Sequence, residues 1–101
     1  MLSAIIIEAN EQELALLYNR ARASYTQCLK DNEYLREEAP VPLEAIVVRD
    51  AAVKIVFHQS IIADYLIEVE LSLYANDSYM GRYTYSENKG GDGVEDGLVF
   101  Y

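Results

Sequence analysis

The stretch ADYLIEVELSLY, from Ala63 to Tyr74, alternates apolar and polar residues with a period of two. This period is typical of a β-strand that has one face in the core and the other toward water. The stretch therefore predicts a half-buried strand, around which the rest of the chain can be arranged. The apolar face holds Tyr65, Ile67, Val69, Leu71 and Leu73, and the other face holds Asp64, Leu66, Glu68, Glu70, Ser72 and Tyr74.

Shorter segments on both sides of this strand are also predicted to be extended. They are rich in β-branched residues and bounded by turn-forming residues, which is the usual pattern of strands in a meander. The predicted strands are 3–9, 43–50, 51–58, 79–86 and 97–101, with a turn at 75–78 and a connection near Arg49, Asp50 and Ala51.

A long amphipathic helix is predicted from Glu11 to Glu37. Asn10 followed three residues later by Glu13 is a capping-box arrangement, which marks the start of a helix. Two prolines, Pro40 and Pro42, end it, because proline lacks an amide donor and disfavours helix in the residue before it. Apolar residues recur along one face in steps of three and four, through Leu14, Leu17, Tyr18, Ala21, Tyr25, Cys28, Leu29 and Leu35.

These elements predict an α+β fold in the order β-α-β-β-β-β. One amphipathic helix can cover one face of an antiparallel meander, so we expect a curved sheet of four to five strands wrapped on the helix. A chain of 101 residues has the size of one domain, predicted to span residues 1–101. The arrangement resembles the cystatin fold in outline, but the Gln-x-Val-x-Gly hairpin of those inhibitors is missing and no activity is implied.

The charge of the chain is strongly negative, with 8 Lys and Arg against 17 Asp and Glu and a net charge of −9. Such a field repels phosphate backbones, so direct nucleic-acid binding is not expected and a protein with a basic surface is the favoured partner. Cys28 is the only cysteine, which suits a reducing compartment. The N-terminus lacks a basic region before its apolar run, and no stretch reaches the ~20 apolar residues of a membrane span. We therefore expect a cytoplasmic protein without membrane contact.

The segment NKGGDGVEDG, Asn88 to Gly97, raises the question of a phosphate or calcium site. A dinucleotide-binding loop has the pattern Gly-x-Gly-x-x-Gly and opens a helix. After Gly91 and Gly93 the third glycine, Gly97, comes one residue too late for this pattern, and no helix fits after it. The calcium repeat Gly-Gly-x-Gly-x-Asp has Glu95 in place of its aspartate, and one copy cannot supply six to eight oxygen ligands. We expect a long, mobile hairpin loop without a cofactor or resident metal.

Candidate catalytic residues are few, and we expect the protein not to be an enzyme. Glu68 and Glu70 share one strand face at the spacing of an acid and base pair, but any two alternate acids on a strand do so. His58, the only histidine, is predicted at a strand end, and Cys28 lies on the apolar helix face as a core residue. None of these patterns predicts an activated nucleophile.

Tyrosine is over-represented, with nine in the chain, and Tyr79, Gly81, Tyr83 and Tyr85 are predicted to share one strand face. Tyrosine is enriched at protein-binding surfaces, although the same face could instead pack on the helix. The predicted protein-binding residues are Glu68, Glu70, Tyr74, Tyr79, Tyr83, Tyr85, Glu87 and Asp92. We interpret the chain as an acidic binding module, of the inhibitor or immunity type, for a basic partner such as a nuclease. The alternatives are a structural homodimer or larger homo-oligomer and, third, a small-molecule-binding domain.

Overall fold

The computed structural model describes residues 10–58 and 61–101 and confirms the α+β fold. The strand predicted at 3–9 lies outside the described residues. The elements are α1 (Glu11–Asp31), α2 (Leu35–Glu38), the 3-10 turn η1 (Leu43–Ala45), β1 (Val47–His58), β2 (Ile61–Ala75), β3 (Ser78–Asn88) and β4 (Gly93–Phe100).

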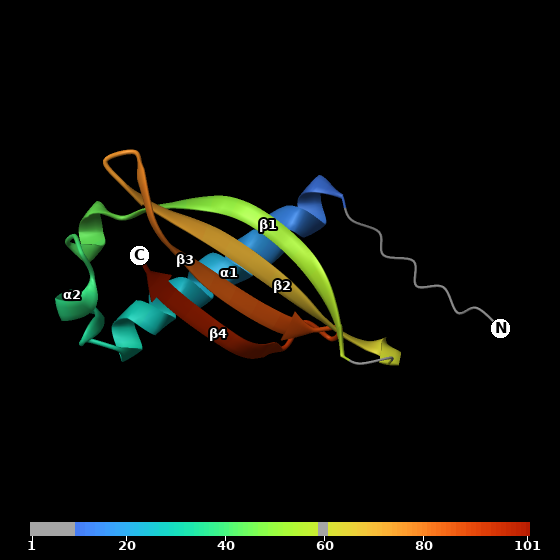
Figure 1. Cartoon of the computed structure of the whole chain (residues 1–101). Helices are drawn as coiled ribbons and strands as arrows, with labels where there is room; N and C mark the ends of the chain where they lie inside the picture. Colours follow the sequence, from blue (N-terminus) through green and yellow to red (C-terminus); the bar gives the residue numbers. More distant parts are fainter. Residues whose placement is uncertain (1–9, 59–60) are drawn as a thin grey trace.

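The four strands form one antiparallel sheet in the order β1-β2-β3-β4, as expected for a meander. In Figure 1 the curved strands pass in front of α1, which crosses the sheet diagonally and packs on β2 and β3. We call the face toward α1 the inner face and the opposite one the outer face. No described element covers the outer face, so whatever meets this sheet from that side must come from outside the described chain.

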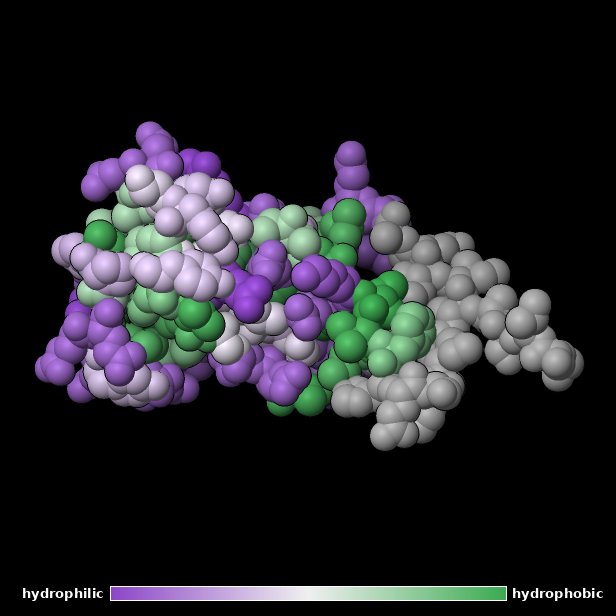
Figure 2. All heavy atoms as spheres, viewed as in Figure 1, coloured by the Kyte–Doolittle hydropathy of each residue, from purple (hydrophilic) through white to green (hydrophobic). Residues whose placement is uncertain are grey.

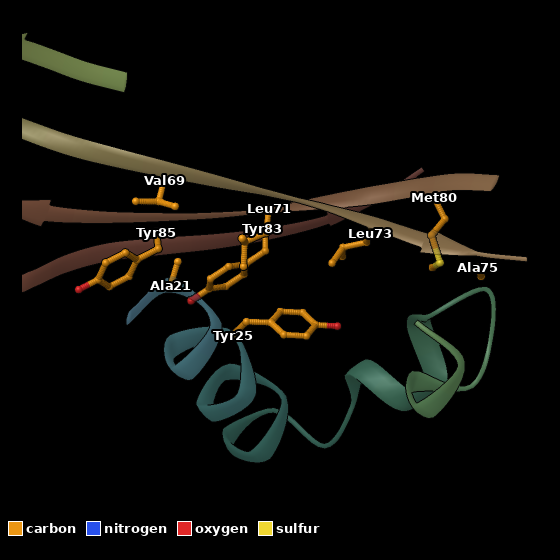
Figure 3. Packing of buried hydrophobic residues seen from close by; sticks show 9 residues of the cluster. All are labelled: Ala21, Tyr25, Val69, Leu71, Leu73, Ala75, Met80, Tyr83 and Tyr85. Atoms are coloured by element: carbon orange, nitrogen blue, oxygen red, sulfur yellow. The ribbon is translucent and has the colours of Figure 1, made fainter. Parts of the chain in front are cut away.

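The strand that decides the fold is oriented as predicted. Val69, Leu71 and Leu73 of β2 are fully buried on the inner face, where they meet the apolar side of α1. Figure 3 shows these side chains above Ala21 and Tyr25 of the helix. Burial of this aliphatic row removes most of its apolar surface from water, which is the main force that holds helix and sheet together.

The helix begins as predicted but ends early. The Glu13 amide donates to the Asn10 side-chain oxygen at 2.9 Å, which is the N-cap hydrogen bond expected from the sequence. At the other end the Asn32 side-chain amide donates to the Cys28 carbonyl at 2.8 Å. This bond satisfies one of the last carbonyls of the helix, which lack donors further along the helix. The predicted extension to Glu37 is therefore wrong, and the last turn of apolar periodicity belongs to the separate α2.

The predicted connection near Arg49, Asp50 and Ala51 is also wrong, because β1 continues through it without reversing. Asp50 pairs with Leu71 and Ala52 with Glu70, so Ala51 is an extra residue in the strand. This irregularity is a β-bulge, and it places Asp50 on the inner face, where its carboxylate accepts from Arg22 of α1 at 2.6 Å. The segment lacks the Gly or Pro that a tight reversal usually requires.

The predicted turn at 75–78 is confirmed, whereas the last hairpin is tighter than the sequence predicted. Asn76 and Asp77 both adopt positive φ, 51° and 62°, which matches the twist of a two-residue β-hairpin. The predicted loop at 88–97 shortens to a turn, because β4 already begins at Gly93. The Asn88 side-chain oxygen accepts from the amides of Gly90 and Asp92 at 2.9 and 3.1 Å and fixes this turn. The expected long loop is thus largely a strand.

Candidate functional site

The predicted tyrosine surface is divided between the two faces of the sheet. Tyr74 pairs with Tyr79 but Leu73 pairs with Gly81, so Met80 is an extra residue that reverses the facing of β3. Tyr83 is therefore fully buried on the inner face, and Tyr85, also inner, is only 8% exposed. Figure 3 shows the rings of Tyr83 and Tyr85 projecting from β3 toward α1. The prediction that Tyr79 and these two rings share a face is wrong.

Glu87, also predicted as part of the exposed surface, is 1% exposed. Its two carboxylate oxygens accept from Arg20 Nε and Nη2 at 2.9 and 3.1 Å. This bidentate geometry is the strongest form of a protein ion pair. Glu87 therefore holds α1 on the sheet and is not available to a partner, whereas Asp92 is exposed in the β3–β4 turn.

The outer face brings Glu68, Glu70, Tyr74 and Tyr79 together as the sequence suggested. Glu68 and Glu70 each lie beside a basic residue. Lys54 of β1 lies directly opposite Glu68 in the ladder, and Arg82 of β3 lies 3.5 Å from the Glu70 carboxylate. Figure 2 shows hydrophilic residues across the middle of this face, with more apolar residues toward its ends. The strands β1 to β3 thus carry balanced charges on the outer face, whereas Glu95 of β4, which pairs with Ser86, adds an acid without a described cation at its edge.

One end of the outer face carries an aromatic cluster. The sequence predicted Tyr74 and Tyr79 as part of a binding surface, but not Tyr101 or Arg49. The ring centroids of Tyr74 and Tyr79 lie 5.6 Å apart, and those of Tyr79 and Tyr101 lie 5.7 Å apart. The Arg49 guanidinium sits 4.2 Å from the centroid of the Tyr74 ring in a cation–π contact. These residues pack on one another instead of on the core, so they remain open to solvent.

Unbalanced acidic charge gathers on a different surface, between the C-terminal half of α1 and the edge strand β4. Two hollows of about 380 and 260 Å³ adjoin there and share Cys28, Asn32 and Asp96 in their walls. We call them together the α1–β4 groove. Four carboxylates line the groove and neither Lys nor Arg does; the carboxylates are Asp31, Glu38, Glu95 and Asp96.

The groove gathers four carboxylates that have no ion pair, although it is not alone in this, since Glu11, Glu33 and Glu68 among the described acids have none either. Five other acids, Asp50, Glu44, Glu70, Asp77 and Glu87, each have an arginine within ion-pair distance. Within residues 10–58 and 61–101, the groove carboxylates have no such cation. Asp31 accepts only from the Gln27 amide at 2.8 Å, and Asp96 only from the Tyr83 hydroxyl at 2.7 Å. The groove therefore keeps an uncompensated negative field.

The groove acids also act on the only cysteine. Burial raises the pKa of the Cys28 thiol, and the carboxylates of Asp96 and Asp31 raise it further, although the Asn32 amide opposes them. A thiol held in its protonated form is a poor nucleophile. In the part of the chain that the structure describes, no three His, Cys, Asp or Glu residues gather in a way that could hold a metal ion. The side chain of His58 lies outside the described residues.

Sequence reasoning missed the groove, although half of its acids lie in the segment it singled out. Glu95 and Asp96 belong to the acid-rich stretch before Gly97, whereas Asp31 and Glu38 lie about sixty residues earlier. Only the packing of α1 across the sheet brings the two sets together. No helix within the described residues is long and apolar enough to cross a membrane. Comparisons of the chain with protein-family models, curated proteins and solved structures found no match.

Proposed function

We propose that the chain is a non-enzymatic protein-binding module whose α1–β4 groove receives a basic region of a partner protein. The observation that carries this proposal is the set of carboxylates in the groove that have no cation in the described chain. Complementary charges on two proteins speed their association and select the right partner. They contribute less to the affinity of the complex itself. A Lys- or Arg-rich segment would supply the missing cations.

The partner class that fits best is a protein that itself binds nucleic acid, for example a nuclease. Such proteins carry basic clefts because phosphate binding depends on displacing condensed counterions. A Lys- or Arg-bearing segment from such a protein could enter the groove, where the carboxylates would take the place of phosphates. The groove is built on a helix and a strand, so its acids are held in position before binding, which lowers the entropic cost of association.

A charge-matched comparison tests the proposal. The probe is a peptide of four Lys-Thr repeats, titrated by calorimetry into the full chain at low salt, with a Glu-Thr peptide as the negative control. We expect binding of the Lys-Thr peptide only, and a loss of affinity of about tenfold in the variant Asp31→Asn/Glu95→Gln. The matched control is Glu11→Gln/Glu13→Gln, which removes the same charge at the exposed start of α1 and should change affinity less than about twofold.

Two results would contradict this proposal. Equal losses in both variants would mean that only net charge matters, and the groove would then have no special role. No binding of the Lys-Thr peptide at any salt concentration would remove the basic partner altogether. The proposal that the partner is a nuclease is tested with a defined panel of basic nucleases. Addition of the protein should slow substrate cleavage by at least one of them, and addition of the groove variant Asp31→Asn/Glu95→Gln should not.

The alternative function, homo-oligomerisation, is favoured by the aromatic cluster at the end of the outer face. Val47, Tyr79, Val99 and Tyr101 are each between 42% and 65% exposed and lie on this same end of the outer face, so they form one apolar patch. A second copy could cover this end. Sedimentation at high concentration would then give a dimer that the variant Tyr79→Ser/Tyr101→Ser converts to monomer, whereas a monomeric parent chain excludes this function.

A further inference from the structure

The geometry of β4 points to strand addition as the way in which the groove takes its partner. We propose that an extended basic segment pairs, as a fifth strand of the sheet, with the edge of β4 that no described strand covers. The inference rests on the proposed function and specifies its binding mode: main-chain hydrogen bonds to β4 on one side, and side-chain contacts with the acids of the α1–β4 groove on the other.

The hydrogen-bond pattern identifies which groups of β4 are open. The Tyr101 amide donates to the Met80 carbonyl at 2.8 Å, and bonds in an antiparallel ladder alternate from one residue to the next. The alternation directs the main-chain groups of Glu95, Gly97 and Val99 toward β3. Those of the residues between them point away from the sheet; these residues are Asp96, Leu98 and Phe100. No described group outside the strand bonds to their amides or carbonyls.

The groove provides room for a strand beside this edge. Neighbouring strands lie about 4.7–4.9 Å apart, and the two hollows run beside β4 from Gly93 to Leu98. The far wall beside the first half of β4 is formed by Ser24, Cys28 and Asp31 of α1 and by its C-cap residue Asn32. Beside the second half of β4 it is formed by Tyr34, Leu35 and Glu38. Beside Gly93 to Asp96 a partner strand would meet mostly short polar side chains, whereas beyond Asp96 it would pass Tyr34 and Leu35.

The groove also selects what the added strand should carry. Side chains of a strand alternate between faces, so every second residue of the partner would face α1, near Asp31 and Asp96. The intervening residues would face the outer side, near Glu95 and Gly97. A Cβ on Gly97 would have no atom within 4 Å, so there is space for a large partner side chain there. A segment with Lys or Arg at alternate positions fits this arrangement.

A second copy of the chain is the less favoured occupant of this edge. Two β4 edges paired with each other would bring their Glu95 and Asp96 side chains together, and like charges on paired strands are destabilising. The other free edge, β1, is interrupted by the bulge at Ala51, and Arg22 already donates to the Val48 carbonyl at 3.3 Å. The charge of the groove thus favours a basic segment from another protein.

Amide hydrogen exchange of the full chain, followed by NMR, tests strand addition directly. On addition of the Lys-Thr peptide, exchange of the Asp96, Leu98 and Phe100 amides should slow by about tenfold or more, because they gain hydrogen-bond partners. The amides of Glu95, Gly97 and Val99 are the internal control, since they already bond to β3. Unchanged exchange at the open amides in the presence of bound peptide would overturn the inference.

Two N-methylated peptides provide an independent test of the same idea. One is methylated at every Lys amide and the other at every Thr amide, so each blocks one edge of an extended strand and keeps the charge. Strand addition requires that one version lose affinity by about tenfold while the other binds nearly as the parent does.

The outcomes separate this inference from the proposed function. Equal binding of both methylated peptides refutes strand addition and leaves the basic partner in place. Failure of every Lys-Thr peptide to bind refutes both. Slow hydrogen exchange at the Asp96, Leu98 and Phe100 amides in the absence of peptide, together with a dimer in sedimentation, would show that a second copy of the chain covers this edge. That result would overturn the inference.

Discussion

At the scale of single residues, the Arg20–Glu87 ion pair should contribute more to stability than any other ion pair of the described chain. Glu87 is 1% exposed, so its carboxylate has few water molecules to replace Arg20. We expect Arg20→Met to lower the free energy of unfolding by about 2–3 kcal/mol, somewhat below the range for a fully buried pair because Arg20 is itself partly exposed. Denaturant unfolding of the variant measures the loss.

The control for this prediction is Arg36→Met. Arg36 and Glu44 lie 2.5 Å apart, but their side chains are 63% and 66% exposed. Water screens such a pair, so its removal should lower stability far less than the loss of Arg20 does. Similar losses in both variants would contradict a special role of Glu87. The double variant Arg20→Met/Glu87→Met should recover part of the loss, since no unpaired carboxylate then stays buried.

Tyr83 predicts how stability changes at alkaline pH. Burial raises the pKa of its hydroxyl above the usual 10.0, and Asp96 raises it further while Ser24 lowers it. Below pH 10 the hydroxyl is protonated in both states. Above pH 10 the unfolded chain loses this proton first, so stability should fall as pH rises toward the higher pKa of the folded state.

The variant Tyr83→Phe isolates this effect. At neutral pH it should be less stable by about 1–2 kcal/mol, because the hydroxyl bonds to Ser24 and Asp96 at 2.5 and 2.7 Å are lost. Above pH 10 its stability should fall less steeply than that of the parent, by about 1.4 kcal/mol per pH unit for the one proton removed. Parallel pH profiles of the two proteins would show that Tyr83 does not titrate differently on unfolding.

At the scale of the elements, the contact between β3 and β4 depends on one glycine. A Cβ on Gly81 would overlap the carbonyl oxygen of Val99, which belongs to the backbone and cannot turn aside. We expect Gly81→Ala to lower stability by about 1–3 kcal/mol, as for other overpacked sites. Gly97→Ala is the control on the neighbouring strand, where the added carbon meets nothing within 4 Å and stability should stay within about 0.5 kcal/mol. Thermal unfolding of both variants distinguishes strand packing from a general effect of glycine.

The elements could be predicted from sequence where a single local signal decided them. The alternation in β2 predicted its buried face, and Asn10 marked the start of α1. The errors lie where pairing between strands decides the outcome. The bulges at Ala51 and Met80 are determined by the registers of β1 and β3 against β2, which no pattern within one strand contains.

The same reason explains the outcome for the candidate site. One extra residue, Met80, places Tyr83 and Tyr85 on the inner face and Tyr79 on the outer face. The single tyrosine surface that the spacing predicted is therefore wrong. The acids of the α1–β4 groove come from distant parts of the chain and meet only through the packing of α1. The sequence predicted an acidic surface beside the tyrosines of β3, whereas the structure gathers unpaired acids at the α1–β4 groove, which only the tertiary structure assembles.

At the scale of the whole molecule, the net charge of −9 is unevenly compensated. The acids of the sheet faces mostly have arginine partners, whereas the groove gathers Asp31, Glu38, Glu95 and Asp96 without a described cation. Like charges held close together oppose folding. If the groove is a binding site, it should therefore reduce stability, and this cost can be measured without knowing the partner.

Neutralising two groove acids should stabilise the chain. We expect Asp31→Asn/Glu95→Gln to raise the free energy of unfolding at low salt by about 0.5–1 kcal/mol, which is a few degrees in Tm for a chain of this size. The gain should shrink at high salt, because ions screen the repulsion that the variant removes. Asp50→Asn is the opposite case, because the Arg22 guanidinium lies 2.6 Å from the Asp50 carboxylate. Removal of this paired charge should lower stability or leave stability unchanged. A groove variant less stable than the parent at low salt would mean that these acids hold the fold together, and their unpaired charge would then need no partner to explain it.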